Sequence, residues 1–309
     1  MVEDKSQNVE LTDHEAELYD RQIRLWGLES QKRLREAKVL LIGLNGYGAE
    51  IAKNVILAGV KAITFLDHRN ITVQDRCSQF LAPRELLGKN RAEASVQRAQ
   101  NLNPMVNVEA DTSNVDDKPD KYFSNFNVVC ATQCTITQIK RINEACRKHN
   151  VKFFSGDVWG SLGYTFADLM THEFLEMYKQ RKYKSLKAAN LCKRINLKIS
   201  KDAFTLYILI LVMLNYREKY GKDPLPSERG SEDFVREAAA IIKKYDLEDK
   251  INHLVESDLY AQISPVCAIV GGIMGQEIIK TVSQKGTPHN NLFIFNPDTL
   301  CGKILRLGQ

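Results

Sequence analysis

The sequence predicts an α/β fold with a doubly wound, mostly parallel sheet. Two observations support this prediction. Short apolar runs alternate with segments of helical period through the first 155 residues, and a glycine-rich turn follows the first run. Parallel strands are buried on both faces, so they read as continuous apolar runs, and strand–helix–strand units of this spacing imply right-handed crossovers.

The expected elements can be placed in order along the chain. Thr12 and Glu15 form a capping-box pattern, which predicts a helix that begins there and runs to about residue 35. The periodicity then predicts strands at 38–43, 60–66, 106–109, 127–131 and 151–155, with helices at 46–58, 90–101 and 136–149.

The pattern changes after Gly156. We expect an antiparallel strand at 163–169, helices at 201–220, 231–245 and 265–283, and closing strands at 292–295 and 303–307. Two neighbouring glycines, Gly271 and Gly272, predict a close approach between helices. We interpret residues 1–309 as one domain. It has a core at 12–170, a variable helical region at 171–252 and a C-terminal helix with strands at 253–309.

Composition narrows the class of protein. Apolar residues make up 44% of the 309, charged residues 26%, and the net charge of +5 is mild, so nucleic-acid binding is not indicated. The seven cysteines contain no C-x-x-C pair, so neither a disulfide framework nor a paired zinc site is expected. Residues 1–10 lack the apolar stretch of a secretory signal, and the apolar run 206–214 is too short to span a membrane. A reducing compartment fits this cysteine pattern, and we expect a protein of the nucleus that also occurs in the cytoplasm.

The turn after the first strand carries an incomplete nucleotide-binding motif. Gly43 and Gly48 match the first and third glycines of G-x-G-x-x-G, but the middle position is Asn45. The middle glycine lets a phosphate approach the backbone, so a side chain there interferes. Asp67, after the second strand, has the position of the ribose-binding acid. We favour a tight turn with a structural Asp67 over a working nucleotide site.

Four ordered segments resemble the adenylation fold of the enzymes that activate ubiquitin-like proteins. The resemblance covers residues 15–170 and 258–309 and implies a Rossmann-like adenylation fold. Its motifs are Tyr19–Gly27, Gly48–Asp67, Gly88–Pro104 and Pro265–Lys280. Within the family, the chain is most similar to the smaller, non-catalytic subunits of heterodimeric SUMO-activating enzymes.

The resemblance also implies that the active site has decayed. Catalytic members need a glycine-rich loop, a basic pair before Gln-Phe, a lysine after Gly-Lys and a magnesium-binding aspartate after the fourth strand. At the first three positions this sequence has Asn45, Cys77-Ser78 and Arg91, and after the fourth strand it has Ala131-Thr132-Gln133, with no carboxylate. No segment is long enough for the domain that carries the thioester cysteine, and we interpret Cys267 as a buried structural thiol.

In this family, an N-terminal arginine of one half reaches the ATP phosphates held by the other half. On that resemblance Arg21 is the first candidate for a residue that acts in trans, and Arg24 is a weaker second. The alternative is that Arg21 pairs with Asp20 or Glu17. ATP and Mg²⁺ are then expected on the large catalytic subunit. That subunit would also provide most of the SUMO contacts.

Three other functions compete with this hypothesis. A stand-alone adenylyltransferase of the sulfur-carrier type would keep the active site and usually carry two C-x-x-C pairs. A nicotinamide-dependent dehydrogenase would need the middle glycine and a catalytic constellation, which the six histidines do not form. A pure scaffold would make no use of Arg21.

The stretch 179–201 has nine basic residues and no acidic one. It is a candidate import signal or a surface for an acidic partner, although we favour a solvated linker.

Overall fold

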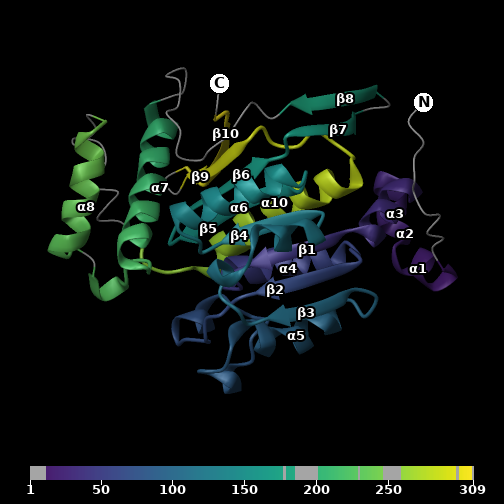
Figure 1. Ribbon diagram of the computed structural model, residues 1–309, viewed down its shortest axis with the longest axis horizontal. Helices are drawn as coiled ribbons and strands as arrows, with labels where there is room; N and C mark the ends of the chain where they lie inside the picture. Colours follow the sequence, from purple (N-terminus) through teal and green to yellow (C-terminus); the bar gives the residue numbers. More distant parts are fainter. Residues whose placement is uncertain are drawn as a thin grey trace.

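The computed structural model describes residues 12–176, 179–184, 201–228, 230–245, 259–296 and 299–307. In this part of the chain, eight strands form one twisted sheet in the order β10-β9-β6-β5-β4-β1-β2-β3 (Figure 1). The strands are β1 Lys38–Ile42, β2 Ala62–Leu66, β3 Asn107–Asp111, β4 Val128–Thr132, β5 Lys152–Trp159, β6 Leu162–Asp168, β9 Leu292–Asn296 and β10 Cys301–Leu305.

The sheet is parallel from β3 to β5 and antiparallel beyond β5. The predicted antiparallel strand at 163–169 is confirmed as β6, which pairs with β5 from Phe153–Asp168 to Trp159–Leu162. The two closing strands are also confirmed, since β9 and β10 extend the sheet as an antiparallel pair. The doubly wound α/β fold is therefore as expected.

Helices cover both faces of the sheet. Four helices lie on one face: α3 (Leu28–Glu36), α4 (Gly46–Leu57), α5 (Arg91–Leu102) and α10 (Ser264–Ser283). The other face is covered by α6 (Ile136–Lys148) and α7 (Lys201–Tyr220), and α8 (Glu232–Lys243) packs on α7. Successive residues of β1 alternate between the two cores: Val39 and Leu41 pack under α4, and Leu40 and Ile42 pack on the other side. This alternation follows from the period of two in a strand.

The predicted close helix contact involves α10 and α4. A Cβ on Gly271 would lie 2.6 Å from the Cβ of Glu50, and one on Gly275 would lie 2.6 Å from the Cβ of Asn54. Gly272 faces open space instead. By length and composition alone α10 could cross a membrane, but 56% of its apolar window is buried against the protein.

The single helix predicted for 12–35 was wrong, because the structure has three. They are α1 (Asp13–Leu18), α2 (Asp20–Trp26) and α3, interrupted at Tyr19 and at Gly27, where φ is +91°. Tyr19 is buried because its hydroxyl accepts a hydrogen bond from Asn103 at 2.8 Å and its ring packs on Gly59. The predicted capping box of Thr12 and Glu15 is confirmed.

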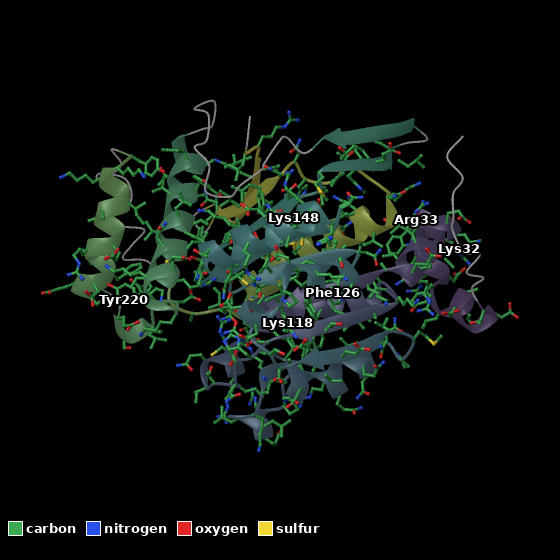
Figure 2. The ribbon with its side chains drawn as sticks, viewed as in Figure 1. Lys32, Arg33, Lys118, Phe126, Lys148 and Tyr220 are labelled. Atoms are coloured by element: carbon green, nitrogen blue, oxygen red, sulfur yellow. The ribbon has the colours of Figure 1, made fainter. Side chains whose placement is uncertain are left out.

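The N-terminal helices are tied to the rest of the domain by α3. Arg33, labelled on α3 in Figure 2, donates from Nε to the carbonyl oxygen of Ser283 at 3.1 Å, at the end of α10. The Nη2 of Arg35 lies 2.5 Å from the buried carboxylate of Glu15. These contacts hold α3 against α10 and α1 against α3.

The region 171–252 does not begin with a helix. It begins with a hairpin of β7 (Thr171–Glu176) and β8 (Lys179–Lys184), a separate two-stranded sheet. The basic stretch therefore starts in a strand rather than a linker, and its residues 185–200 lie outside the described residues. Helices were predicted correctly at α7 and α8.

Candidate functional site

The turn from β1 to α4 brings the glycine motif to the carboxyl edge of the sheet. Gly43 has a φ of +79°, and a Cβ there would lie 2.6 Å from the carbonyl oxygen of Thr132. A Cβ on Gly48 would collide with the carbonyl oxygen of Gly43. Contacts within the protein therefore explain why both positions must be glycine.

Asn45, at the middle position of the motif, caps α4. Its Oδ1 accepts a hydrogen bond from the backbone amide of Gly48 at 2.9 Å, and the residue is buried. Amides at a helix N-terminus are the groups that bind phosphate in nucleotide-binding turns. Ser78 also packs tightly on this turn, since a Cβ on Gly46 would collide with it. Asn45 and Ser78 therefore fill the space in front of the helix.

Asp67 is fully engaged by the protein. Its Oδ2 accepts from the amide of Leu44 and from Nε of Arg91, each at 2.8 Å, and its Oδ1 accepts from the amide of Arg69 at 3.0 Å. Burial acts to raise the pKa of Asp67, but Arg91 and the backbone amide outweigh burial and hold the pKa below its ordinary value. A carboxylate with these partners is not available to a ribose hydroxyl.

Arg91 lies where a catalytic lysine was expected, and it is 3% exposed. Besides Asp67, its guanidinium contacts Asp75 Oδ1 at 2.9 Å and Gln133 Oε1 at 2.6 Å. Gln133, in the segment where catalytic members have a magnesium-binding aspartate, also accepts from Nη1 of Arg69 at 3.2 Å. One buried cluster thus joins two of the altered positions.

A second cluster lies beside the first, at the ends of β5 and α7. Arg217 contacts Asp157 at 2.6 Å and Asp223 at 2.8 Å, and its guanidinium lies 5.2 Å from the centre of the Trp159 ring. Asp157 also accepts from the backbone amide of Gln133, at 3.2 Å. Burial raises the pKa of Asp157 to about 6, although Arg217 acts to lower it.

The two clusters line a cavity of roughly 520 Å³, to which Asn45, Arg69 and Tyr260 also contribute. Four cations are at or behind its wall, and five carboxylates bind them or neighbouring amides. The cations are Arg69, Arg91, Arg217 and Lys222, and the carboxylates are Asp67, Asp75, Asp157, Asp223 and Glu228. A polyphosphate would therefore meet fixed charges that already neutralise one another. Among the described residues, no three His, Cys, Asp or Glu side chains are grouped to hold a metal ion. These residues do not fit MgATP.

The two N-terminal arginines have different environments. Arg24 pairs with Asp20, with Nη2 3.0 Å from Oδ2. Arg21 is exposed and makes no side-chain hydrogen bond or ion pair within the part of the chain that the structure describes. The alternative pairing of Arg21 with Asp20 or Glu17 is thus not what the structure has. Leu25 and Leu28 beside it are 74% and 46% exposed.

This domain matches the ThiF family over residues 19–307. The chain belongs to the ThiF family. Among curated ThiF relatives, SUMO-activating enzyme subunit 1 of Xenopus laevis is 42% identical over 335 aligned positions, which cover 97% of both chains. The human protein of the same name is 40% identical and covers 96% of both. The Escherichia coli MccB structure shares the fold, with a TM-score of 0.60, 14% identity, and coverage of 94% of this chain and 72% of that one.

The sequence did not reveal the second cluster of this ThiF domain. Asp157 is a charged residue within the buried strand β5, and Arg217 lies in the charged last turn of α7. The available signal was the carboxylate of Asp157 in the buried strand, because such a charge needs a buried partner. The partner itself is 60 residues away and could not be read from local pattern.

Four thiols of the ThiF domain are buried: Cys130, Cys134, Cys146 and Cys267. Burial raises the pKa of Cys267 to about 12, as expected for a structural thiol rather than a nucleophile. Cys77 and Cys301 are exposed, and Cys192 lies outside the described residues.

Proposed function

We propose that this chain is the non-catalytic subunit of a heterodimeric SUMO-activating enzyme. With a large catalytic subunit, it supports the ATP-dependent adenylation of the SUMO C-terminus and its transfer to the partner's cysteine. The observation that carries the proposal is the buried bond from Arg91 to Asp67, which uses the acid that a nucleotide would need. The named relatives, which align over almost the whole chain, support the choice of modifier.

The same site argues against catalysis by this chain alone. The amide of Gly48 is bonded to Asn45, and Gln133 is neutral where Mg²⁺ requires a carboxylate oxygen. Each change removes a contact that a nucleotide or its cation would use. ATP and Mg²⁺ would therefore bind to the partner, and this chain supplies residues from outside that site.

Arg21 is the residue that we assign to the partner's ATP phosphates. Its guanidinium is exposed and free of any acidic partner within the described residues, so no ion pair must break before it binds an anion. The planar guanidinium suits bidentate bonds to phosphate oxygens, and such a group stabilises the charge that shifts during phosphoryl chemistry. Exposed apolar side chains of Leu18, Leu25 and Leu28 around it suit burial against a partner.

The test is SUMO-dependent exchange of pyrophosphate into ATP. We expect no exchange with the chain alone, and exchange when the large SUMO-activating subunit is added. Exchange by the chain alone would contradict the proposal and favour a stand-alone adenylyltransferase. Failure of this chain to bind the large subunit would also contradict the proposal.

A further inference from the structure

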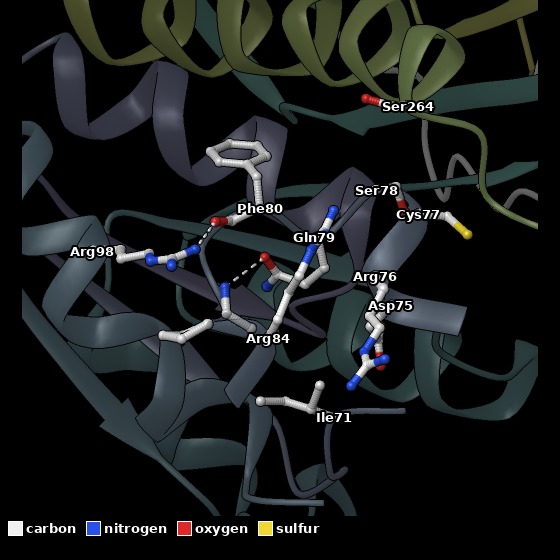
Figure 3. Close-up of a pocket in the computed structure, with 12 residues that line it drawn as sticks. Ile71, Asp75, Arg76, Cys77, Ser78, Gln79, Phe80, Arg84, Arg98 and Ser264 are labelled. Atoms are coloured by element: carbon white, nitrogen blue, oxygen red, sulfur yellow. Dashed lines mark hydrogen bonds between the residues drawn. The ribbon is translucent and has the colours of Figure 1, made fainter. Parts of the chain in front are cut away.

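A second hollow adjoins the cavity described above at the segment 74–80. It has a volume of roughly 270 Å³, and we name it the basic hollow (Figure 3). Its floor is apolar, with Ile71, Ala82 and Pro83, and its rim includes Arg76, Arg84, Arg98 and Ser264, the first residue of α10. Ser78 lies between the two cavities and lines both.

The arginines of the basic hollow have no acidic partner within the described residues. Arg98 donates only to the carbonyl oxygen of Phe80, at 3.0 Å, and Arg84 extends across the hollow (Figure 3). The one carboxylate in the lining, Asp75, is already bonded to Arg91 and Thr72. The start of α10, which has no side-chain cap, adds positive partial charge. Among the residues that the structure describes, nothing therefore compensates the positive charge of the hollow.

Exposed apolar side chains lie on the segment that forms most of the basic hollow, and one of them, Phe80, lines it. Val73, Phe80, Leu86 and Leu87 are 61%, 39%, 36% and 42% exposed, and all belong to the connection between β2 and α5. A free small anion would bind the arginines and leave these side chains in water. A polypeptide segment with both carboxylates and apolar side chains would cover both, and arginine with aromatic residues is the usual composition of interface centres.

The basic hollow is continuous with the surface that carries Arg21. Gln22 of α2 donates to the carbonyl oxygen of Leu57 at the end of α4, and Leu57 is 44% exposed. One turn earlier in α4, the Nζ of Lys53 lies 5.7 Å from the centre of the Phe80 ring. Ile269 of α10, packed beside α4, is 45% exposed. A partner that covers Arg21 could therefore extend along α4 to the hollow.

We propose that the basic hollow receives an acidic segment of the catalytic partner subunit. Carboxylates of that segment pair with Arg84 and Arg98, and its apolar side chains cover Phe80. This inference rests on the proposed function. It adds a second, electrostatic attachment point, separate from Arg21, and that point fixes the orientation of the two subunits.

The test uses the full chain with Arg84→Glu and Arg98→Glu together, and it measures association with the purified large SUMO-activating subunit at low and high salt. The matched control carries Lys140→Glu and Lys148→Glu, two charge reversals on α6, which covers the opposite face of the sheet. We expect the hollow variant to bind on the order of ten- to a hundredfold more weakly, with a slower association rate and a smaller salt dependence. The control should bind like the wild type. Thermal unfolding of both variants checks that they fold.

Three outcomes would overturn the inference. One is wild-type affinity of the hollow variant, and another is an equal loss in the control, which would reflect net charge alone. The third is loss of binding to inorganic phosphate with unchanged partner affinity, which would make the hollow a small-anion site. If the wild-type chain itself does not bind the large subunit, the proposed function fails first, and the two failures are thereby distinguished.

Discussion

Arg91 and Asp67 form a buried ion pair, 2.8 Å from Nε to Oδ2, at the carboxyl edge of the sheet. Both residues are 3% exposed. The pair lies where a nucleotide-binding member of this fold would hold its ribose and phosphates. Because both side chains are engaged within the protein, we infer that the pair stabilises the domain.

Replacement of Arg91 by alanine should therefore be strongly destabilising. The variant would leave Asp67 buried without its cation, and breaking such a pair costs about 3–5 kcal/mol. Urea titrations of the variant and the wild type should show this decrease in the free energy of unfolding. Lys140→Ala, an exposed substitution on α6, should leave the value nearly unchanged. A loss below about 1 kcal/mol for Arg91→Ala would show that the cluster is dispensable to the fold.

His172 should make stability depend on pH. Burial, with Lys152 nearby, lowers its pKa to about 4, and its Nε2 has no hydrogen-bond partner among the described residues. The unfolded chain then binds more protons than the folded one between pH 4 and 6.5, so stability is complete above pH 6.5 and is lost as pH falls. The loss is on the order of 3 kcal/mol.

The measurement for His172 is the free energy of unfolding at pH 7, 6, 5 and 4. His172→Phe should remove this component of the pH dependence, whereas His149→Gln, at an exposed histidine, should retain it. The same slope in wild type and His172→Phe would mean that other groups cause it.

The described cysteines should fall into two classes of reactivity. Cys77 and Cys301 are exposed, whereas Cys130, Cys134, Cys146 and Cys267 are buried thiols with raised pKa values. Maleimide labelling at pH 7, mapped by peptide mass, should modify the first two within minutes and the other four only after denaturation. Rapid labelling of Cys267 in the native protein would contradict its structural role.

Local features were the part of the fold that the sequence could predict. The turn Gly43–Gly48 follows an apolar run and opens a helix, so its position is recognisable within twelve residues. The break of the N-terminal helix at Tyr19 was not recognisable in this way. Tyr19 is drawn into the core by Asn103, which is 84 residues away, and this tertiary bond outweighs the helical pattern.

In the candidate site, too, only the local features could be predicted from the sequence. Asn45 and Gln133 depart from a known motif, so the altered positions could be named. The network that replaces the ligand could not, because Arg217 reaches Asp157 from a helix 60 residues further along the chain. The free state of Arg21 also depends on Arg24, which takes the nearby carboxylate of Asp20.

In the proposed function, Arg21 acts on ATP bound by the partner. The most direct measurement is SUMO-dependent ATP–pyrophosphate exchange by the assembled heterodimer with Arg21→Ala, Arg21→Lys or Arg24→Ala. We predict that Arg21→Ala forms the heterodimer normally but loses activity on the order of a hundredfold, with partial rescue by lysine and a smaller effect at Arg24. Full activity of an Arg21→Ala heterodimer would contradict the account and leave the chain as a scaffold.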